Sequence, residues 1–293
     1  IIMHINLENE KIKVVLSTYA GEIESIVNKQ TGNEHWWNYD DKWWPRRTSI
    51  CFPICGSLTD DEYIYQGKTY KLPMHGFLRE KEFTITEQSS NRLVMKYVSN
   101  EETKASYPFD FRFILTQEIN NNHYKIIYTV ENTGEKDMYY SVGSHYTYNV
   151  PIIPTEKQED YHYKFGAVQK GGKFIIENGA ISGKTSDIFN GRDAIEISGL
   201  FENGSTILDL ADINPHYIQI ENKKKSAYTK VSFEGFSYCV LWAPKGVSPF
   251  ACIEPWTGLP DQINHDKDLS KKLGITKVKS GMKNNRQQMI TVG

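Results

Sequence analysis

Two residues of this chain have the types and the settings that proton-transfer chemistry needs. Glu254 directly follows the apolar run 250–253, and His145 follows the apolar run 138–142. We therefore expect both side chains where a strand leaves the core, on two different strands. A carboxylate and an imidazole that face each other across a bound ligand can act as general base and general acid. This pair is the first candidate for a catalytic centre.

Four segments interrupt the regular pattern of the chain with residues that folding alone does not require. They are residues 43–56, 72–79, 141–151 and 252–261. The first holds two adjacent arginines, the second and third each hold a histidine close to a glycine, and the fourth holds the glutamate. Each feature alone also has a structural reading, as a hydrogen-bonded histidine, a surface carboxylate or a solvated arginine edge. Their combination favours a polar site built from several strand ends.

The elements that must position these residues are mainly β-strands. Short runs of alternating apolar and polar residues recur along the chain, and turn residues separate them. Examples are a tight hairpin predicted at 63–70 and long strands predicted at 109–119 and 124–131. The best helical signal is the segment 266–274, which ends in a glycine.

The pattern as a whole predicts an all-β fold. It contains no Gly/Ser-rich linker, no internal repeat and no shift of composition, so we expect a single domain over residues 1–293. Many short strands joined by hairpin turns predict one large antiparallel β-sandwich. Aromatic residues make up 13% of the chain. That content favours strands, and it also fits a sugar-binding surface, where flat rings cover the apolar face of a pyranose.

Charge and composition limit the possible partners. The net charge of −2 gives no reason to expect binding to nucleic acid or to an anionic membrane. The chain has no signal-peptide pattern and no run of the ~20 apolar residues that a membrane span needs. Its four cysteines, Cys51, Cys55, Cys239 and Cys252, lie in apolar runs without CxxC or zinc spacing. We expect a cytoplasmic protein with buried thiols and without a metal or cofactor.

Three of the segments together resemble the signature segments of a known family. Residues 74–79 read Met-His-Gly-Phe-Leu-Arg, residues 143–149 read Gly-Ser-His-Tyr-Thr-Tyr-Asn, and residues 253–261 read Ile-Glu-Pro-Trp-Thr-Gly-Leu-Pro-Asp. In this order and at these separations they look like the aldose 1-epimerase (galactose mutarotase-like) family. Residues 52–56, Phe-Pro-Ile-Cys-Gly, are similar to its bacterial LacX-like branch. The resemblance spans nearly the whole chain.

The resemblance implies a galactose mutarotase-like supersandwich and gives individual residues a role. Glu254 matches the general base of the family, His145 matches the general acid, and His75 matches the second active-site histidine, which holds the substrate. An arginine just before the Phe-Pro strand contacts the sugar in relatives. Arg46 and Arg47 are both candidates for that contact.

Two further residues are expected at the substrate. Family members use an aspartate from a strand between the two catalytic residues, and Asp209 is the nearest candidate. Trp256 follows the glutamate by two residues and is expected to contact the sugar. The segment around Trp256 departs from the galactose mutarotases proper, and Ser49 stands where a proline is usual. These departures leave the proton chemistry in place and leave the identity of the sugar open.

The activity that the resemblance implies is the interconversion of the α and β anomers of a free hexose. An ionised Glu254 takes the proton of O1, and a protonated His145 gives a proton to O5 as the C1–O5 bond opens. His145 must then carry its proton near neutral pH, supported by a carboxylate or a polar pocket. The rate is expected to have a bell-shaped dependence on pH.

Two other functions remain open. Arg46, Arg47 and Arg79 near one pocket would suit a phosphate dianion, as in a hexose-6-phosphate mutarotase. For Arg79, the role of a structural ion-pair partner is preferred to a contact with phosphate. The fold also carries carbohydrate-binding proteins without catalysis, although a binding module has no need of a paired acid and base. The expected partner is a small-molecule sugar in each case, and the expected assembly is a monomer or a homodimer.

Overall fold

Antiparallel strands form most of the regular structure. The computed structural model describes residues 2–45, 49–202 and 204–293. All pairs of named strands run antiparallel. The predicted all-β fold with large antiparallel sheets is confirmed.

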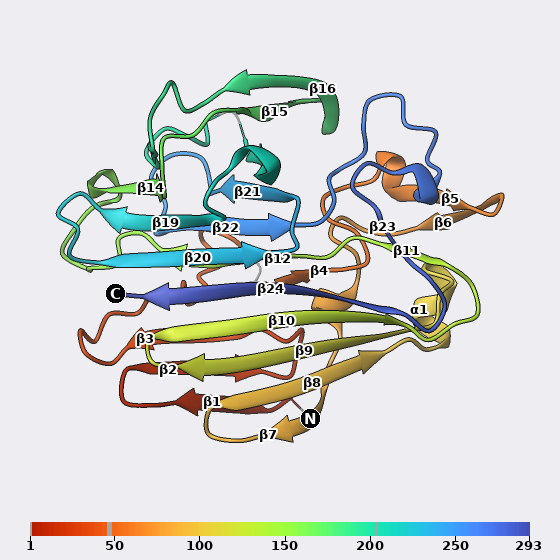
Figure 1. The fold of residues 1–293 in the computed structure, drawn as a ribbon, viewed down its shortest axis with the longest axis horizontal. Helices are drawn as coiled ribbons and strands as arrows, with labels where there is room; N and C mark the ends of the chain where they lie inside the picture. Colours follow the sequence, from red (N-terminus) through yellow and green to blue (C-terminus); the bar gives the residue numbers. More distant parts are fainter. Residues whose placement is uncertain (1, 46–48, 203) are drawn as a thin grey trace.

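The larger sheet has nine strands, which run across the view of Figure 1 from β14 down to β7. From one edge to the other they are β17 (Ala194–Glu196), β14 (Tyr161–Phe165), β19 (Tyr217–Asn222), β20 (Tyr228–Glu234), β24 (Lys283–Val292), β10 (His123–Asn132), β9 (Phe111–Asn120), β8 (Arg92–Val98) and β7 (Thr84–Gln88). Every second side chain of β10 is buried, as alternation predicts for a strand with one face on the core. This sheet forms one wall of the core.

The second large sheet has eight strands and includes parts of three of the four segments that the sequence singles out, 43–56, 141–151 and 252–261. In order they are β16 (Ala180–Asp187), β15 (Gly172–Glu177), β18 (Thr206–Asp209), β21 (Tyr238–Trp242), β22 (Phe250–Trp256), β12 (Gly143–His145) and β4 (Ser49–Cys51), and β13 (Thr147–Asn149) also pairs with β22. The hairpin of β15 and β16 projects at the top of Figure 1.

The remaining elements are short. Three small sheets contain β1 (His4–Glu8), β2 (Ile12–Ser17) and β3 (Ile23–Asn28); β5 (Glu62–Tyr65) and β6 (Lys68–Lys71); and β11 (Met138–Tyr140) and β23 (Thr276–Val278). The helical elements are α1 (Glu101–Ser106) and five 3-10 turns: η1 (Thr59–Asp61), η2 (Leu78–Glu80), η3 (Gln158–Asp160), η4 (Leu210–Asp212) and η5 (Leu269–Lys271). Among the described residues, no helix has the length and apolar character that a bilayer span requires.

The two large sheets meet across a core that also contains buried polar contacts. One cluster of buried apolar side chains has members from Ile5 to Val292, so both ends of the chain contribute to it. Hydrogen bonds cross between the sheets within this core. The Tyr128 hydroxyl donates to the Tyr146 hydroxyl at 2.9 Å, and the Tyr163 hydroxyl donates to the Cys252 carbonyl at 2.9 Å. These directional contacts fix how the strands of the eight-stranded sheet lie over the nine-stranded sheet.

Several predicted strands have clear counterparts, and one predicted helix is wrong. The predicted hairpin is β5–β6, and the two predicted long strands are β9 and β10. The segment 266–274 forms only the single turn η5. Lys267 has a positive φ of 64°, and its carbonyl accepts a hydrogen bond from Ile64 N at 2.7 Å. This pairing with β5 holds the start of the segment in a conformation that an α-helix cannot include.

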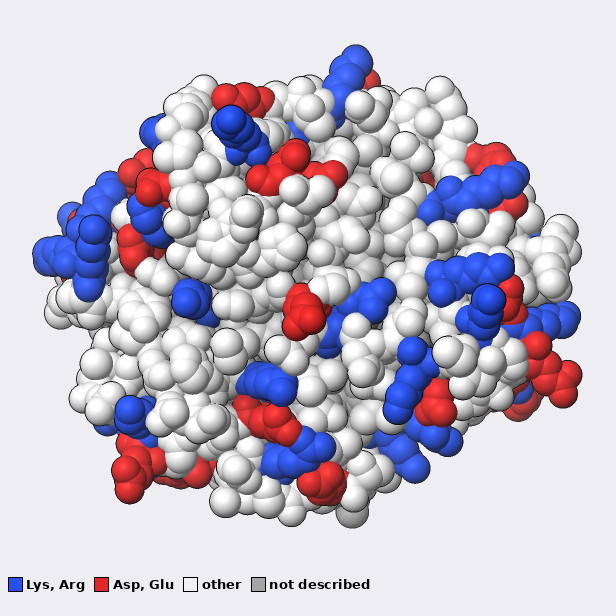
Figure 2. Space-filling model, in the orientation of Figure 1, with Lys and Arg blue, Asp and Glu red and all other residues white. Residues whose placement is uncertain are grey.

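Charged side chains of both signs are interspersed over the face of the molecule drawn in Figure 2. The net charge of −2 arises from 34 basic and 36 acidic residues. Most of the ion pairs that can be located join exposed or half-exposed partners, such as Lys184 with Glu177. Exposed ion pairs of this kind contribute little to the stability of the fold. Most of the stability must therefore come from the packing of the two sheets against each other.

Gly76 is a position where only glycine fits, and it yields a first prediction. Its φ is +69°, and a Cβ atom there would lie 2.2 Å from the carbonyl oxygen of Phe52. Backbone groups on both sides of Gly76 bind the neighbouring segment, because Phe52 N donates to His75 O and Phe77 N donates to Phe52 O. We expect Gly76→Ala to lower the free energy of unfolding by more than the 1–2 kcal/mol or so that left-handed backbone alone costs.

Gly67→Ala is the matched control for this prediction. Gly67 has a φ of +76° in the β5–β6 turn, and a Cβ atom there would meet nothing within 4 Å. Urea unfolding of both variants separates the steric clash from the backbone cost, which they share. Equal losses of stability in the two variants would contradict the tight contact between Gly76 and Phe52.

Candidate active site

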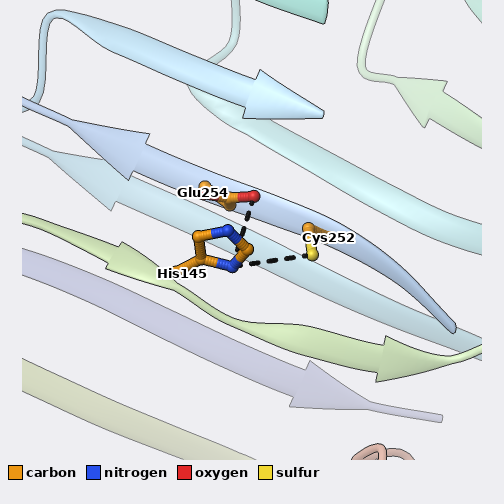
Figure 3. Close-up of side chains that lie close together, drawn as sticks. All are labelled: His145, Cys252 and Glu254. Atoms are coloured by element: carbon orange, nitrogen blue, oxygen red, sulfur yellow. Dashed lines mark hydrogen bonds and ion pairs between the residues drawn. The ribbon is translucent and has the colours of Figure 1, made fainter. Parts of the chain in front are cut away.

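The structure places Glu254 and His145 directly opposite each other on neighbouring strands. β12 and β13 both pair with β22 in one continuous register, which aligns His145 with Glu254. Residues that stand opposite in an antiparallel pair have Cβ atoms about 5 Å apart. Accordingly, His145 Nδ1 lies 3.6 Å from Glu254 Oε1, and both side chains point to the same side of the sheet (Figure 3).

Glu254 lies inside β22 rather than at the strand end that the sequence predicts. All seven residues of β22 are buried. Ala251 and Ile253 face the core that the two large sheets share, whereas Cys252 and Glu254 face the opposite side. The side chain of Glu254 is 1% exposed, against 12% for His145. The pair is therefore buried beneath the surface, so a ligand must enter the protein to reach it.

A second cross-strand pair shows what is unusual about the first. His162 of β14 stands opposite Glu221 of β19, and its Nε2 lies 3.1 Å from Glu221 Oε1. Glu221 Oε2 also accepts a hydrogen bond from Gln219. By contrast, neither carboxylate oxygen of Glu254 has a nitrogen or oxygen hydrogen-bond partner among the described residues, and the Cys252 thiol is a weak donor beside them. A buried carboxyl group without hydrogen bonds is costly, which points to a ligand that supplies them.

Burial favours the neutral form of both partners. It raises the pKa of Glu254 well above the usual 4.5, an effect that the Cys252 thiol opposes and Cys55 reinforces. It also lowers the pKa of His145 from 6.5 to about 3; a hydrogen bond with the backbone of His145 opposes this shift, and the charge of Arg79 adds to it. The expectation that His145 is protonated near neutral pH is wrong for this structure. A carboxyl group does lie beside the ring, but burial favours its neutral form, so it does not hold a proton on His145.

His75 reaches the same site from the loop before η2. Its Nδ1 accepts a hydrogen bond from Gly56 N at 3.1 Å, and Cys51 Sγ lies 3.3 Å from the same atom. A ring nitrogen that accepts a backbone N–H carries no proton, so the neutral ring carries its proton on Nε2. The His75 and His145 rings are 5.4 Å apart at 86°. His75 thus lies beside the pair as a hydrogen-bond donor.

A cavity of about 310 Å³ opens in front of the pair. Its lining combines three tryptophans, six polar or charged side chains and a mainly apolar remainder: Trp44, Trp242, Trp256, Ser57, His75, Arg79, His145, Ser205, Glu254, Gly56, Met74, Ile176, Ile207, Val240 and Pro260. Pockets that are mostly apolar, with a few convergent polar groups, are typical sites for small molecules. The predicted site residues Glu254, His145, His75 and Trp256 all line this one cavity.

The tryptophans shape the walls of the cavity. Trp44 stacks on His145 with ring centroids 4.6 Å apart and an angle of 22°, and Trp242 meets the same ring edge-on at 5.5 Å. Trp256 Nε1 donates to the Ser144 carbonyl at 3.1 Å. Because its N–H group is used within the protein, Trp256 offers a ligand its ring rather than a hydrogen bond.

Of the arginines that the sequence proposes, one can be located. Arg79 lies on η2 and lines the cavity with the pair. Arg46 and Arg47 lie outside the described residues. Their flanking residues Pro45 and Ser49 line a second, more open cavity that shares Arg79 with the first.

Asp209 is the predicted site residue that the structure places elsewhere. Its Oδ1 accepts a hydrogen bond from Ala211 N at 2.9 Å and so caps η4. It lines a different cavity, together with Asp187. The residue of β18 that aligns with Glu254, through Val240 of β21, is Ile207. The assignment of Asp209 to the site is therefore wrong, because strand register brings an apolar residue to that place.

Three residues around the pair were not predicted from the sequence. Cys252 Sγ lies 4.0 Å from His145 Nδ1, and its position two residues before Glu254 on one strand was an available signal. Trp242 stands opposite Cys252 across β21 and β22, which only strand pairing reveals. Trp44 belongs to a segment that the sequence singles out, but its stacking on His145 depends on the tertiary fold. All four cysteines are buried and free, as predicted.

The chain is similar over most of its length to proteins of a known family. The family model described as aldose 1-epimerase matches residues 3–271. Protein LacX of Lactococcus lactis subsp. lactis, in its chromosomal and plasmid forms, is 30% identical over 286 residues, which cover 94% of this chain and 95% of LacX.

Solved structures agree with this assignment. The galactose mutarotase related enzyme from Lactobacillus acidophilus has a TM-score of 0.94 at 27% identity, with 99% of this chain and 97% of that chain covered. A galactose mutarotase-like protein from Lactobacillus casei ATCC 334 has a TM-score of 0.92 at 26% identity, with 99% and 100% covered. The galactose 1-epimerase from Lactobacillus acidophilus NCFM shares the fold, with a TM-score of 0.75 at 15% identity and 100% and 94% covered. The fold is galactose mutarotase-like, as the signature segments implied, and the chain belongs to the aldose 1-epimerase family.

Proposed function

We propose that this protein interconverts the α and β anomers of a free hexose, with Glu254 as general base and His145 as general acid. The observation that carries the proposal is the pair itself. A carboxyl group and an imidazole stand 3.6 Å apart, buried at the wall of a cavity, and the carboxylate oxygens have no nitrogen or oxygen hydrogen-bond partner among the described residues. In a pair with only a structural role, we would expect the carboxylate oxygens to have hydrogen-bond partners, as those of Glu221 have beside His162.

The reaction requires two proton transfers and no other reagent. The carboxylate of Glu254 takes the proton of O1, and the imidazolium of His145 gives a proton to O5 while the C1–O5 bond breaks. The open aldehyde rotates about the C1–C2 bond. O5 then attacks the other face of C1, and both proton transfers run in reverse. The pair ends in its starting protonation state, so turnover needs no external acid, base or oxidant.

The protonation states that burial favours are compatible with this cycle. The pair holds one transferable proton whether that proton is on Glu254 or on His145. In the protein alone the proton belongs on Glu254, and His145 is neutral. Sugar hydroxyl groups that enter the cavity can hydrogen-bond to both side chains, and hydrogen bonds to a charged form favour that form. Substrate binding therefore promotes transfer of the proton from Glu254 to His145.

The other proposed contacts position the sugar. His75 donates from Nε2 to a sugar oxygen, and the ring of Trp256 covers an apolar face. Arg79 is the observation that favours a second candidate substrate, since a guanidinium at the cavity also suits a hexose 6-phosphate.

The first functional test is the rate at which freshly dissolved α-D-galactose and α-D-glucose approach anomeric equilibrium, followed by polarimetry with the spontaneous rate subtracted. We expect the protein to accelerate it, and we expect Glu254→Gln and His145→Asn each to lower kcat/KM by about 10²–10⁴, the usual contribution of one positioned proton transfer. The variants His162→Asn and Glu221→Gln carry the same substitutions in the other cross-strand pair and should retain activity.

Three results would redirect the proposal. Acceleration only with the 6-phosphates would make the chain a phosphosugar mutarotase. Sugar binding in calorimetry without acceleration of either substrate would make it a carbohydrate-binding protein. Equal activity in Glu254→Gln and in Glu221→Gln would remove Glu254 from the mechanism.

The pH dependence of kcat/KM is the second prediction, because it reports the pair in the free protein. Activity needs one proton on the pair, so it is lost at low pH when His145 also binds a proton and at high pH when Glu254 loses its own. Burial lowers the pKa of His145 to about 3 and raises that of Glu254. We expect a bell with a broad top, whose acid flank lies well below pH 6.5. An acid flank at the ordinary histidine value would show that the ring is not desolvated.

The burial of Glu254 also predicts that Glu254→Gln, which should lower activity, raises the free energy of unfolding above pH 4.5. Folding raises the pKa of Glu254 above its unfolded value of 4.5, so the folded state binds this proton more tightly than the unfolded state does. The stability of the wild type relative to Glu254→Gln must fall as the pH rises from 4.5 towards the folded-state pKa, by about 1.4 kcal/mol over each whole pH step of that interval. Urea unfolding at pH 4.5 and at neutral pH measures the difference.

Glu221→Gln is the control, and it should behave in the opposite way. The carboxylate of Glu221 accepts hydrogen bonds from His162 and Gln219, which an amide replaces poorly. We expect this substitution to destabilise the protein at neutral pH, where Glu254→Gln stabilises it. If Glu254→Gln destabilises the protein equally at both pH values, keeping the buried carboxyl group protonated costs the folded state no free energy, and the prediction is wrong.

A further inference from the structure

Three different metal-ligating atoms come together in the active site. Cys252 Sγ, His145 Nδ1 and a carboxylate oxygen of Glu254 all lie within 4.8 Å of one another (Figure 3). His145 Nδ1 is the central atom, 3.6 Å from Glu254 Oε1 and 4.0 Å from Cys252 Sγ. This is the one group of three or more such side chains within the described residues.

The separations are close to those of a tetrahedral zinc site. Zinc binds nitrogen, oxygen and sulfur at about 2.0–2.3 Å, which puts the ligand atoms of a tetrahedron about 3.3–3.7 Å apart. Shifts of a few tenths of an ångström would bring Cys252 and Glu254 to these separations from His145. A thiolate, an imidazole and a carboxylate together also select for zinc and similar ions over calcium and magnesium, which prefer oxygen ligands alone.

The position of the group leaves one side open. His145 and Glu254 line the 310 Å³ cavity, whereas Cys252 lies behind them on the same face of β22. An ion held by the three side chains would therefore have its fourth position towards the cavity. The stacked ring of Trp44 and the edge of Trp242 hold His145 in this orientation, which reduces the ordering that binding would require.

We propose that Cys252, His145 and Glu254 form a binding site for one zinc ion, which occupies the atoms of the pair that the sugar needs. Binding converts the thiol to a thiolate and the carboxylic acid to a carboxylate, and the two protons pass to solvent. The ion takes the lone pairs with which the pair would accept protons. Zinc and sugar therefore exclude each other, and zinc is an inhibitor of the protein rather than its cofactor.

Spectroscopy with Co²⁺ as a probe tests the site without reference to activity. After treatment with a chelator, the full-length wild type is expected to bind one Co²⁺ with a thiolate-to-cobalt charge-transfer band in the near ultraviolet. Zn²⁺ should displace the Co²⁺ and abolish the band. Cys252→Ala should lose the band and weaken Zn²⁺ binding by at least the 10–100-fold or so that even an outer-shell change produces. Cys239→Ala is the matched control, since Cys239 is an equally buried thiol on the neighbouring strand.

The outcomes separate the proposal from its rivals. Loss of the band in Cys252→Ala with its retention in Cys239→Ala supports the site, provided that both variants show the thermal melting of the wild type. Zinc binding without a charge-transfer band, or equal affinity in Cys252→Ala, would assign the ion to surface groups such as His4 and Glu24 and overturn the proposal.

Competition between the ion and the sugar rests on the proposed function and is measured separately. If the protein is a mutarotase, Zn²⁺ should raise the apparent KM for the sugar without changing kcat, and Cys252→Ala should relieve this inhibition. A cobalt band in a protein without mutarotase activity would leave the metal site in place and reject the proposed function. Activity that Zn²⁺ at saturating concentration does not inhibit would overturn the exclusion of sugar by zinc.

Discussion

The structure depends on a single strand that is buried on both faces. Because alternate side chains of β22 point to opposite sides, Ala251 and Ile253 complete the core between the two large sheets while Glu254 faces a cavity. A register shift of one residue would put a carboxyl group into that core, at a cost of several kcal/mol. Correct pairing of β22 with β21 and β12 is thus a condition for stability and for the site at once.

The surroundings of this strand hold the site rigid. Gly56 and Gly76, both with positive φ, allow the loops around residues 52–56 and 73–77 to lie against each other. Their hydrogen bonds hold the His75 ring by its Nδ1 and leave its Nε2 side as the donor. The buried ion pair of Lys272 with Asp261, at 2.6 Å, fastens the chain that follows β22. Such a pair is costly to break when one partner is removed, so it specifies the path of the chain.

Local sequence patterns were sufficient for many strands, and they singled out two side chains that the structure brings together, Glu254 and His145. Alternation identified β9 and β10, and the signature segments brought Glu254, His145 and His75 forward as one group. What local patterns could not provide was pairing between distant strands. Asp209 looked suitable because it is an acidic residue near the right strand. Register, which depends on contacts across the sheet, puts Ile207 beside the site instead.

The same limit applies to elements held by tertiary contacts. The segment 266–274 has the composition of a helix, but pairing of Lys267 with β5 prevents one. The stacking of Trp44 on His145 joins residues about a hundred positions apart, and no periodicity could reveal it. Burial of Glu254 was also beyond prediction, because a carboxylate that follows an apolar run is ordinarily placed at the end of a strand rather than within it.

The contrast between the two histidine–glutamate pairs shows that residue types alone do not make a reactive site. Both pairs stand in register across neighbouring strands, and both are mostly buried. In one, each carboxylate oxygen takes part in a hydrogen bond with a nitrogen; in the other, neither oxygen has a nitrogen or oxygen partner in the described part of the chain. A new hydrogen bond or a new charge in the cavity should strongly change the protonation of the Glu254 carboxyl group, because it acts there with little competition from water. The proposed sugar hydroxyl and the proposed zinc ion would both bind this carboxyl group, and the Cys252 thiol beside it would favour the metal ion.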